Sequence, residues 1–161
     1  MRRDEFKRFF EMHFDAVRSY IYYRCSDTDL ATDIAQEVFV KVWEKKFDIG
    51  DKRIIGLLFK MAREMFISKY RRQEIERRYT ESIRFEYDEV PADGEINYTE
   101  LVMRYETALA NLPETQREVF LMSRNEDLKY SEIAERLSIS VKAVEKRMSG
   151  ALSHLRKVLE E

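Results

Sequence analysis

The sequence contains little glycine, proline or cysteine, and each shortage excludes a class of structure. Its 161 residues include 4 glycines and 2 prolines, too few for the many tight turns of a β-rich fold. The fold class that we expect is therefore all-α. The chain has 1 cysteine, Cys25, which excludes an intramolecular disulfide and suits a reducing compartment.

The sequence also lacks the segments that would place it in a membrane. No apolar run approaches the ~20 residues of a membrane-spanning helix. The opening stretch MRRDEFKRFF has no apolar core of the length that a signal peptide needs. We therefore expect a cytoplasmic protein with no membrane insertion. The formal net charge of −2 argues against a chain that binds polyanions over its whole surface, so a nucleic-acid role must depend on local basic patches.

Residues 131 to 159 carry the pattern of a helix-turn-helix. A short segment places Ile133, Ala134 and Leu137 on one helix face, with the small Ala134 where two helices would cross. Ser140 is suited to cap the next helix, because its hydroxyl accepts an orphan backbone N–H. Two helices joined by so short a turn must cross at a large angle. The apolar face of the second helix is expected to comprise Val144, Met148, Ala151, Leu152 and Leu155.

The opposite face of that second helix is basic. Between residues 141 and 157 there are five basic residues and one acidic residue, Glu145. A narrow basic helix face fits the major groove and its phosphates, whereas the plain alternative is a solvated face of a helical bundle. Gly150 costs about 1 kcal/mol against alanine in mid-helix, and we interpret it as room for close approach to another backbone. This outer face is expected to hold Lys142, Lys146, Ser149, Gly150, Ser153 and Lys157.

Three helices are predicted in the first 80 residues, at about 4–24, 29–45 and 54–78, because each segment carries an apolar stripe at helical spacing. His13 lies on the first stripe, where we interpret it as a packed residue and not as a ligand. The expected core residues are Phe6, Phe9, Phe10, Phe14, Val17, Tyr20 and Ile21, then Ile34, Val38, Val42 and Trp43, then Ile54, Leu58, Met61, Ala62, Met65, Phe66 and Tyr70.

The second of these helices has a polar side that includes Asp33, Gln36, Glu37 and Lys41. Two carboxylates one turn apart would suit metal binding or acid–base chemistry. However, no histidine or cysteine lies at a ligand spacing nearby, and the chain has no activated nucleophile motif. We therefore expect no catalytic residue, no metal and no cofactor, and we interpret this side as an acidic docking face for a basic partner.

The composition changes after residue 80. Residues 81 to 100 hold seven acidic residues and one basic residue. We interpret residues 81–98 as a flexible acidic linker between two small helical domains, at 1–80 and 99–161. Further helices are expected at about 99–111 and from Pro113, as a first helical residue, to about residue 125.

Four stretches, in order along the chain, carry a resemblance to a known family. They are DLATDIAQEVFVKVW at 29–43, LFKMAR at 58–63, NLPETQREVF at 111–120 and the helix-turn-helix at 130–155. The first resembles the second conserved region of the bacterial extracytoplasmic-function sigma factors, within the sigma-70 family. The second resembles their promoter-melting region. The last two resemble the start of their C-terminal domain and its helix-turn-helix.

The resemblance implies a sigma factor that binds core RNA polymerase and directs promoter-specific initiation on double-stranded promoter DNA. The second helix would dock on a coiled coil of the largest polymerase subunit, and the flap would be a further polymerase contact. The loop at 47–53 and the helix after it would read and open the downstream promoter element, and the recognition helix would read the upstream element. An anti-sigma factor is a further partner that the resemblance allows, and no small-molecule substrate is expected.

The implied site residues fall into three groups. Those expected to bind polymerase are Asp33, Gln36, Glu37, Lys41 and Trp43. Those expected at the downstream element and the DNA backbone are Lys52, Arg53, Lys60, Arg63, Lys69, Arg71 and Arg72. Those expected at the upstream element are Lys142, Ala143, Glu145, Lys146, Arg147, Ser149, Gly150 and Ser153.

Three residues depart from the family pattern. Glu64 stands where the family usually has asparagine, and Glu145 and Gly150 stand where some members carry basic residues. An acid does not contact phosphate favourably but accepts from a cytosine amino group, so base preferences do not transfer. Two alternatives stay open from the sequence. One is a stand-alone helix-turn-helix regulator that binds an operator without polymerase, and the other is an enzyme built on the carboxylates at 33 and 37.

Overall fold

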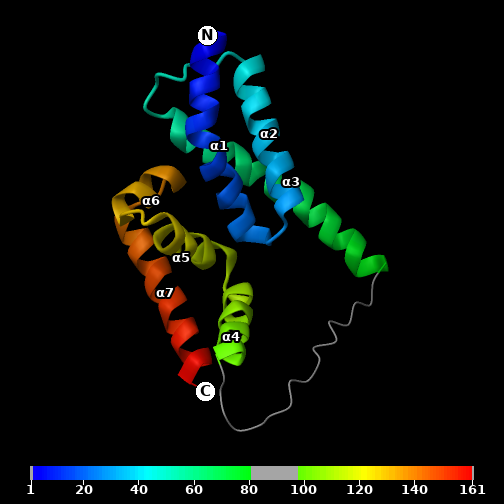
Figure 1. The fold of residues 1–161 in the computed structure, drawn as a ribbon, viewed down its shortest axis with the longest axis vertical. Helices are drawn as coiled ribbons and strands as arrows, with labels where there is room; N and C mark the ends of the chain where they lie inside the picture. Colours follow the sequence, from blue (N-terminus) through cyan, green and yellow to red (C-terminus); the bar gives the residue numbers. More distant parts are fainter. Residues whose placement is uncertain (1, 81–97, 161) are drawn as a thin grey trace.

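The computed structural model describes residues 2–80 and 98–160, and these residues form helices with no strand among them (Figure 1). The helices are α1 (Arg3–Cys25), α2 (Thr28–Glu44), α3 (Ile54–Thr80), α4 (Tyr98–Asn111), α5 (Glu114–Glu126), α6 (Tyr130–Leu137) and α7 (Val141–Glu160). The expected all-α class with a C-terminal helix-turn-helix is confirmed. The predicted linker at 81–98 lies outside the described residues, apart from Tyr98, which begins α4.

Local chemistry sets where the helices begin and end. The Asp27 carboxylate accepts the N–H of Leu30 at 3.1 Å and caps α2. Ser26 ends α1 in the left-handed region, with φ 56°, and its N–H donates to the Tyr22 carbonyl at 2.8 Å. Pro113 is the N-cap of α5 and not its first residue, so the predicted start of that helix was wrong by one position.

The N-terminal half is built on the antiparallel pair α1 and α2, with α3 packed across it (Figure 1). The ring of Phe39 in α2 lies 5.8 Å, 5.1 Å and 5.9 Å from the rings of Phe9, Phe10 and Phe14 in α1. Such ring pairs add to the free energy gained by burying the side chains. The interior of this half contains most of the predicted stripe, including Val17, Tyr20, Ile21, Ile34, Val38, Val42, Ile54, Leu58, Ala62 and Phe66.

In the C-terminal half, α6 and α7 form the predicted helix-turn-helix. The Ser140 hydroxyl accepts the N–H of Ala143 at 3.1 Å, which confirms the predicted cap. Ile133, Ala134 and Leu137 are buried at the crossing of the two helices. The buried face of α7 is Val144, Met148, Ala151 and Leu155.

Two predicted core positions are wrong. Leu152 is 40% exposed, because it lies on the flank of α7 and not on its buried face. Trp43 is 43% exposed, because it stands at the end of α2, where α1 offers it the ring of Phe6 at 5.0 Å.

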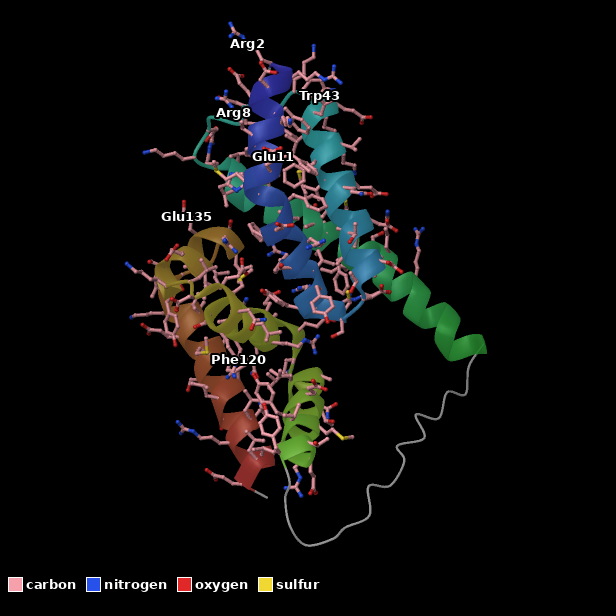
Figure 2. The ribbon with its side chains drawn as sticks, viewed as in Figure 1. Arg2, Arg8, Glu11, Trp43, Phe120 and Glu135 are labelled. Carbon is pink, nitrogen blue, oxygen red and sulfur yellow. The ribbon has the colours of Figure 1, made fainter. Side chains whose placement is uncertain are left out.

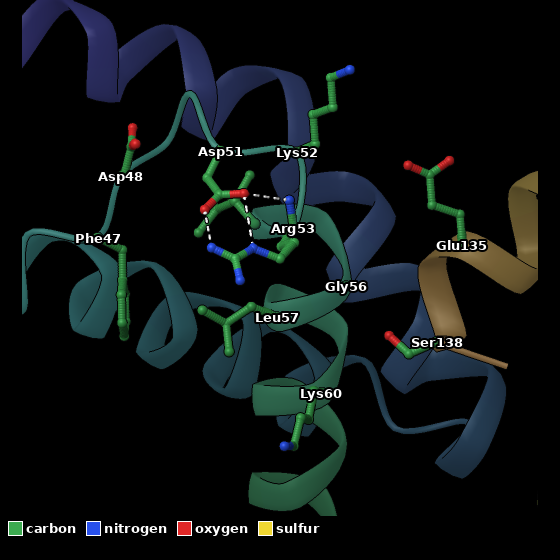
Figure 3. Close-up of a pocket in the computed structure, with 11 residues that line it drawn as sticks. Phe47, Asp48, Asp51, Lys52, Arg53, Gly56, Leu57, Lys60, Glu135 and Ser138 are labelled. Carbon is green, nitrogen blue, oxygen red and sulfur yellow. Dashed lines mark hydrogen bonds and ion pairs between the residues drawn. The ribbon is translucent and has the colours of Figure 1, made fainter.

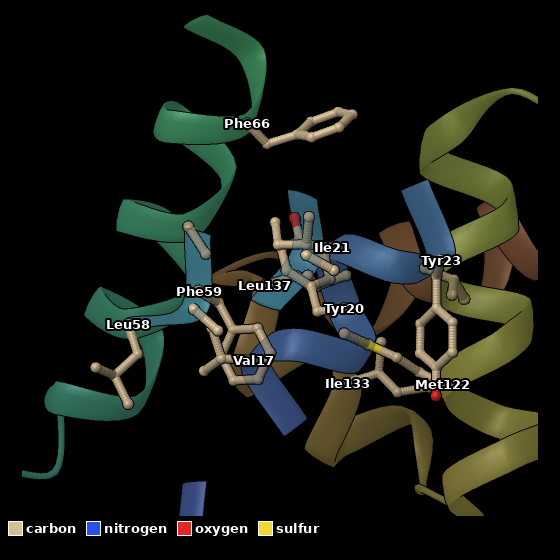
Figure 4. Packing of buried hydrophobic residues seen from close by; sticks show 14 of the residues in the cluster. Val17, Tyr20, Ile21, Tyr23, Leu58, Phe59, Phe66, Met122, Ile133 and Leu137 are labelled. Atoms are coloured by element: carbon tan, nitrogen blue, oxygen red, sulfur yellow. The ribbon is translucent and has the colours of Figure 1, made fainter. Parts of the chain in front are cut away.

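The two halves pack against each other, with α1 on α5 and α3 on α6. Buried residues of both halves meet at this contact (Figure 4), where Tyr20 and Phe59 lie near Ile133, Leu137 and Met122. Phe59 is 2% exposed although it is outside the predicted stripe of α3. Its ring lies 5.3 Å from that of Tyr20, and the Arg136 guanidinium of α6 stands 5.3 Å above it. The C-terminal half therefore completes the burial of this side chain.

Candidate nucleic-acid interface

The recognition helix α7 presents a polar face to solvent. Lys142, Glu145, Lys146, Ser149 and Ser153 are exposed, as their predicted role at the upstream element requires. A shallow hollow runs along this face, and Tyr130 and Arg156 join three of these residues around it. Lysine, serine and a single carboxylate supply both donors and acceptors for base edges and phosphates. Ala143 and Arg147, from the same predicted group, are half-buried.

Gly150 does not lie on this outer face, and that prediction is corrected. A Cβ built on it would meet the amide of Gln116 in α5, with Nε2 at 2.6 Å. The Gln116 side chain fills the notch over the glycine, and its Oε1 lies 3.0 Å from Nδ1 of His154. Gly150 therefore makes room for a side chain of the same domain, not for a DNA backbone. The 100° periodicity placed Gly150 beside Ser149 and could not locate α5.

The loop at 47–53 and the start of α3 form one wall of a cavity of about 660 Å³ (Figure 3). Lys52, Arg53 and Lys60, three residues predicted for the downstream element, line it. Arg53 donates to Asp51 through Nη2 at 2.9 Å. The side-chain and backbone hydrogen bonds from Arg53 hold the pKa of the Asp51 carboxyl below its usual value. The loop thus presents to the cavity a solvent-exposed guanidinium that is paired with Asp51. The opposite wall is Glu135 of α6 and Ser138, the residue that follows this helix.

A smaller cleft lies between the two halves of the molecule. Lys60 and Arg63 of α3 reach it from one side, and Arg147 of α7 reaches it from the other. The structure therefore brings together residues that the sequence assigned to the two separate promoter elements. Lys69, Arg71 and Arg72 lie further along α3 and do not line this cleft. Lys69 forms an ion pair with Glu37 of α2, and the other two side chains are exposed.

Glu118 lies at the centre of the contact between the halves, and its side chain is 1% exposed. Its Oε2 accepts from Arg24 Nε of α1 at 2.7 Å, and its Oε1 lies 3.6 Å from Arg147 Nη1. Burial raises the pKa of Glu118 above its ordinary value, and the two guanidiniums offset only part of that rise. Burial also disfavours the charged form of Arg24, but Glu118 and Tyr20 outweigh it, so the pKa of Arg24 is raised. Because arginine stays charged in proteins, we assign an ion pair here at neutral pH.

The sequence prediction missed Arg24, Glu118 and Arg117 as residues of the contact between the two halves. A signal for the first two was present. Arg24 continues the buried spacing of Tyr20 and Ile21 in α1, and Glu118 lies one turn before the buried Met122 in α5. A charged residue on an apolar stripe calls for a buried partner. The sequence alone could not show that these two are partners, because 94 residues separate them.

The face of α2 that was predicted to bind polymerase is open. Asp33, Gln36, Glu37 and Lys41 are exposed around a shallow hollow, which also reaches Lys69 of α3. Beside it lies an apolar groove between α1 and α2, with Trp43 at its end (Figure 2). The groove was not predicted. Its residues are Arg3, Phe6, Phe10, Gln36, Phe39, Val40, Trp43 and Glu44.

Within residues 2–80 and 98–160, no group of three or more histidine, cysteine, aspartate or glutamate side chains is arranged to hold a metal ion. None of the described helices combines the length and the apolar character needed to cross a membrane.

Comparison with known proteins gives consistent matches over the chain. Residues 9–75 match the family model of sigma-70 region 2, and residues 103–155 match that of sigma-70 region 4. The ferric citrate uptake sigma factor FecI of Escherichia coli (strain K12) is 29% identical over 157 residues, which cover 92% of this chain and 87% of FecI. The ECF RNA polymerase sigma factor SigW of Bacillus subtilis (strain 168) is 26% identical, with coverage of 99% and 91%.

A solved structure shares the fold over nearly the full length of both chains. It is the sigma factor RpoE of Bartonella quintana, in a co-crystal with the anti-sigma factor NepR. The TM-score is 0.63 with 23% sequence identity, and the match covers 97% of each chain.

Proposed function

The chain belongs to the sigma-70 family, in the group of extracytoplasmic-function sigma factors, and we propose how its surfaces divide the work of that family. A sigma factor binds core RNA polymerase and directs promoter-specific initiation of transcription without catalysing the chemistry itself. The proposal concerns which residues of this chain perform each step. It also includes the cytoplasm as the place of action, since the polymerase works there.

For polymerase docking we propose the polar face of α2 together with the apolar groove beside it. Gln36 and Glu37 are exposed, while Ile34 and Val38 on the other side of the helix are fully buried. The exposed Trp43 at the end of the groove supplies an aromatic anchor of the kind that dominates protein interfaces. A coiled coil of the largest polymerase subunit is the proposed partner of this face. The flap is the proposed partner of the C-terminal half.

For the downstream element we propose the cavity at the loop 47–53 and the basic face of α3. Its cations are well placed for phosphates, and its volume of about 660 Å³ leaves room for an unstacked base. For the upstream element we propose the exposed residues of α7, with Lys146 reading bases.

Residues 1–80 and 99–161 are the proposed domains. An anti-sigma factor is a further proposed partner, because the solved chain that shares this fold is bound to one.

The observation that carries the proposal is the capped helix-turn-helix with a solvent-exposed row of lysine and serine residues on α7. The test is reconstitution of the purified chain with core polymerase on a library of promoters, followed by sequencing of the transcripts. We expect transcripts that share one upstream and one downstream element and that are absent with core polymerase alone. Tight binding of the free chain to one DNA sequence, with no dependence on polymerase, would instead identify a stand-alone regulator.

A further inference from the structure

The small cleft between the two halves of the molecule carries an excess of positive charge. Its volume is about 390 Å³, which lies near the lower end of the range for small-molecule sites. Glu118 is the one carboxylate among the side chains that line it. Cations gathered in a cleft raise the local concentration of anions. The cationic side chains of the lining are Arg24, Lys60, Arg63 and Arg147.

The buried ion pair uses one of these four cations. Nε of Arg24 lies 2.7 Å from Glu118, and Glu114, beside the cleft, lies 3.4 Å from the same guanidinium. The charge of Arg24 is therefore offset within the contact itself. Arg147 differs, because its side chain is 30% exposed and its Nη1 lies 3.6 Å from Glu118, beyond hydrogen-bond distance. Arg147 thus keeps its guanidinium donors for a ligand.

Lys60 and Arg63 supply two further cations from α3. Neither forms an ion pair with any residue in the described ranges 2–80 and 98–160. They stand three positions apart, so their side chains lie on one face of the helix. Lys60 is exposed and Arg63 is half-buried. This face of α3 therefore offers the cleft two cations that are not paired with a described carboxylate.

Neutral donors lie among these cations. The hydroxyls of Ser138 and Thr115 line the cleft, and Thr115 stands in the first turn of α5, where the helix dipole favours an anion.

The Tyr20 hydroxyl is fully buried and has no hydrogen-bond partner of normal geometry among the described residues. Burial, and then the charge of Glu118, raise the pKa of Tyr20 to about 12, so this hydroxyl keeps its proton at neutral pH and remains a donor. Two further charged groups that act on it, Arg24 and Arg63, line the cleft. A buried donor without an acceptor is costly. An acceptor at the inner end of the cleft would remove that cost.

We propose that this cleft binds a small phosphate-bearing anion, with Lys60 and Arg63 of α3 on one side of it and Arg147 of α7 on the other. A guanidinium pairs with two phosphate oxygens at once, and a lysine adds a point charge. A phosphate group with about two negative charges suits three cations that surround one buried ion pair. The proposal goes beyond the function proposed above, because it needs neither polymerase nor promoter DNA.

Isothermal titration calorimetry of the free full-length chain with inorganic pyrophosphate tests the site. We expect one site per chain that persists at about 0.15 M salt, where the Debye length is about 8 Å, because charges in a cleft are screened less than charges on an open surface. Lys60→Gln should raise the Kd about tenfold, since a charge-assisted contact to phosphate is lost. Lys60 is exposed, so the variant should fold, and its circular dichroism spectrum checks this.

Lys45→Gln is the matched control. It removes the same charge at an exposed position at the end of α2, outside the cleft, and should leave the Kd unchanged. Equal losses of affinity in the two variants would mean that the anion responds only to net charge, which would overturn the site. The absence of measurable binding by the wild-type chain would overturn it as well.

Arg147→Gln tests the contribution of the C-terminal half. It should also raise the Kd about tenfold, because one side of the cleft then lacks its cation. An unchanged Kd would confine the anion to the surface of α3 and would contradict a site between the halves.

Two further titrations, with ATP and with a DNA duplex, identify the source of the phosphate. ATP that binds more tightly than pyrophosphate would identify a nucleotide as the ligand, and equal affinities would show that the cleft reads the phosphate alone. Binding of the duplex but of neither small anion would overturn the proposal and leave the three cations to promoter DNA. None of these measurements involves polymerase, so their failure leaves the proposed function untouched, and failure of the polymerase reconstitution leaves this site untouched.

Discussion

Nε of Arg24 and Oε2 of Glu118 lie 2.7 Å apart, and the two side chains are 5% and 1% exposed. They come from different halves of the chain, 94 residues apart in sequence. Removing one partner leaves the other charge buried without compensation, at a cost of about 3–5 kcal/mol when no relaxation is possible. Relaxation of the contact would let water reach the remaining charge, which limits the loss.

We predict that Arg24→Gln lowers the free energy of unfolding by about 2–4 kcal/mol, since relaxation around Glu118 recovers part of the cost. The matched variant Arg18→Gln should cost under about 1 kcal/mol, because exposed ion pairs contribute little. Urea denaturation followed by circular dichroism measures both values. Similar losses for the two variants would mean that the buried pair contributes no more than a surface pair.

A second prediction concerns polymerase docking. Replacing Gln36 and Glu37 by lysine should leave the helical circular dichroism spectrum intact, because both side chains are exposed. It should abolish co-purification with core polymerase, because the face then repels a basic partner. Glu11→Lys is a matched control, as an exposed charge reversal on α1 outside the docking hollow and groove. Undiminished co-purification of the double variant would show that docking lies elsewhere.

A third prediction separates base contacts from phosphate contacts on α7. Lys146 is exposed on the outer face, so Lys146→Ala should change the preferred upstream element at one position, at a cost of about 1–3 kcal/mol. Arg147 lies on the flank of α7, 3.6 Å from Glu118, and its proposed partner in DNA is a phosphate, so Arg147→Ala should weaken all cognate promoters alike and reduce the salt slope by about one. Transcript sequencing with each mutant holoenzyme measures promoter preference, and promoter binding at several salt concentrations measures the salt slope. Identical sequence preferences for wild type and Lys146→Ala would remove Lys146 from base readout.

The fourth prediction is a pH dependence that His13 contributes. Burial, and then the charge of Arg136 on α6, hold the pKa of His13 below its ordinary value of 6.5. The unfolded chain therefore binds more protons than the folded chain as the pH falls below about 6.5. The stabilisation is fully present above that pH and is lost as the pH falls through the lowered pKa. His13→Gln should flatten the dependence of unfolding free energy on pH between about 7 and 5, as measured by urea denaturation at each pH.

The fifth prediction concerns the cap of the recognition helix. Ser140→Ala removes the acceptor of the Ala143 N–H and should lower stability by about 1 kcal/mol. Ser140→Asp supplies another acceptor and should retain stability. Ser153→Ala, at an exposed position further along α7, is the control and should change stability little. Thermal unfolding of the three variants makes the comparison, and a null effect of Ser140→Ala would mean that tertiary packing alone fixes the turn.

Much of the fold could be predicted from local signals. The 3.6-residue spacing of apolar residues placed every helix of residues 2–80 and 98–160 within about two residues, and the Ser140 cap was predicted from its side-chain chemistry. The predicted burial of Trp43 and Leu152 was wrong, because periodicity reports which residues share a face and not where the neighbouring helix ends. Gly150 was misplaced for a related reason, since its neighbour Gln116 belongs to another helix.

The arrangement of the two halves could not be predicted. Arg24 and Glu118 each stand on an apolar stripe and each call for a buried partner, but neither spacing nor composition encodes which stripes meet. Phe59 illustrates the same limit, because its burial depends on Arg136 and Tyr20 together. The roles of the site residues remain predictions, while their exposure or burial is now known.

The scarcity of glycine has a practical consequence for engineering this chain. Four described non-glycine residues adopt positive φ, namely Ser26, Lys46, Asp127 and Ser138, and no described glycine does. An L-residue in the left-handed region costs roughly 1–2 kcal/mol that glycine avoids. Glycine at Ser26, Lys46 and Asp127 would therefore give a more heat-resistant chain while leaving every proposed DNA and polymerase contact as it is. Such a chain would tolerate the destabilising substitutions that a search for new promoter specificities accumulates.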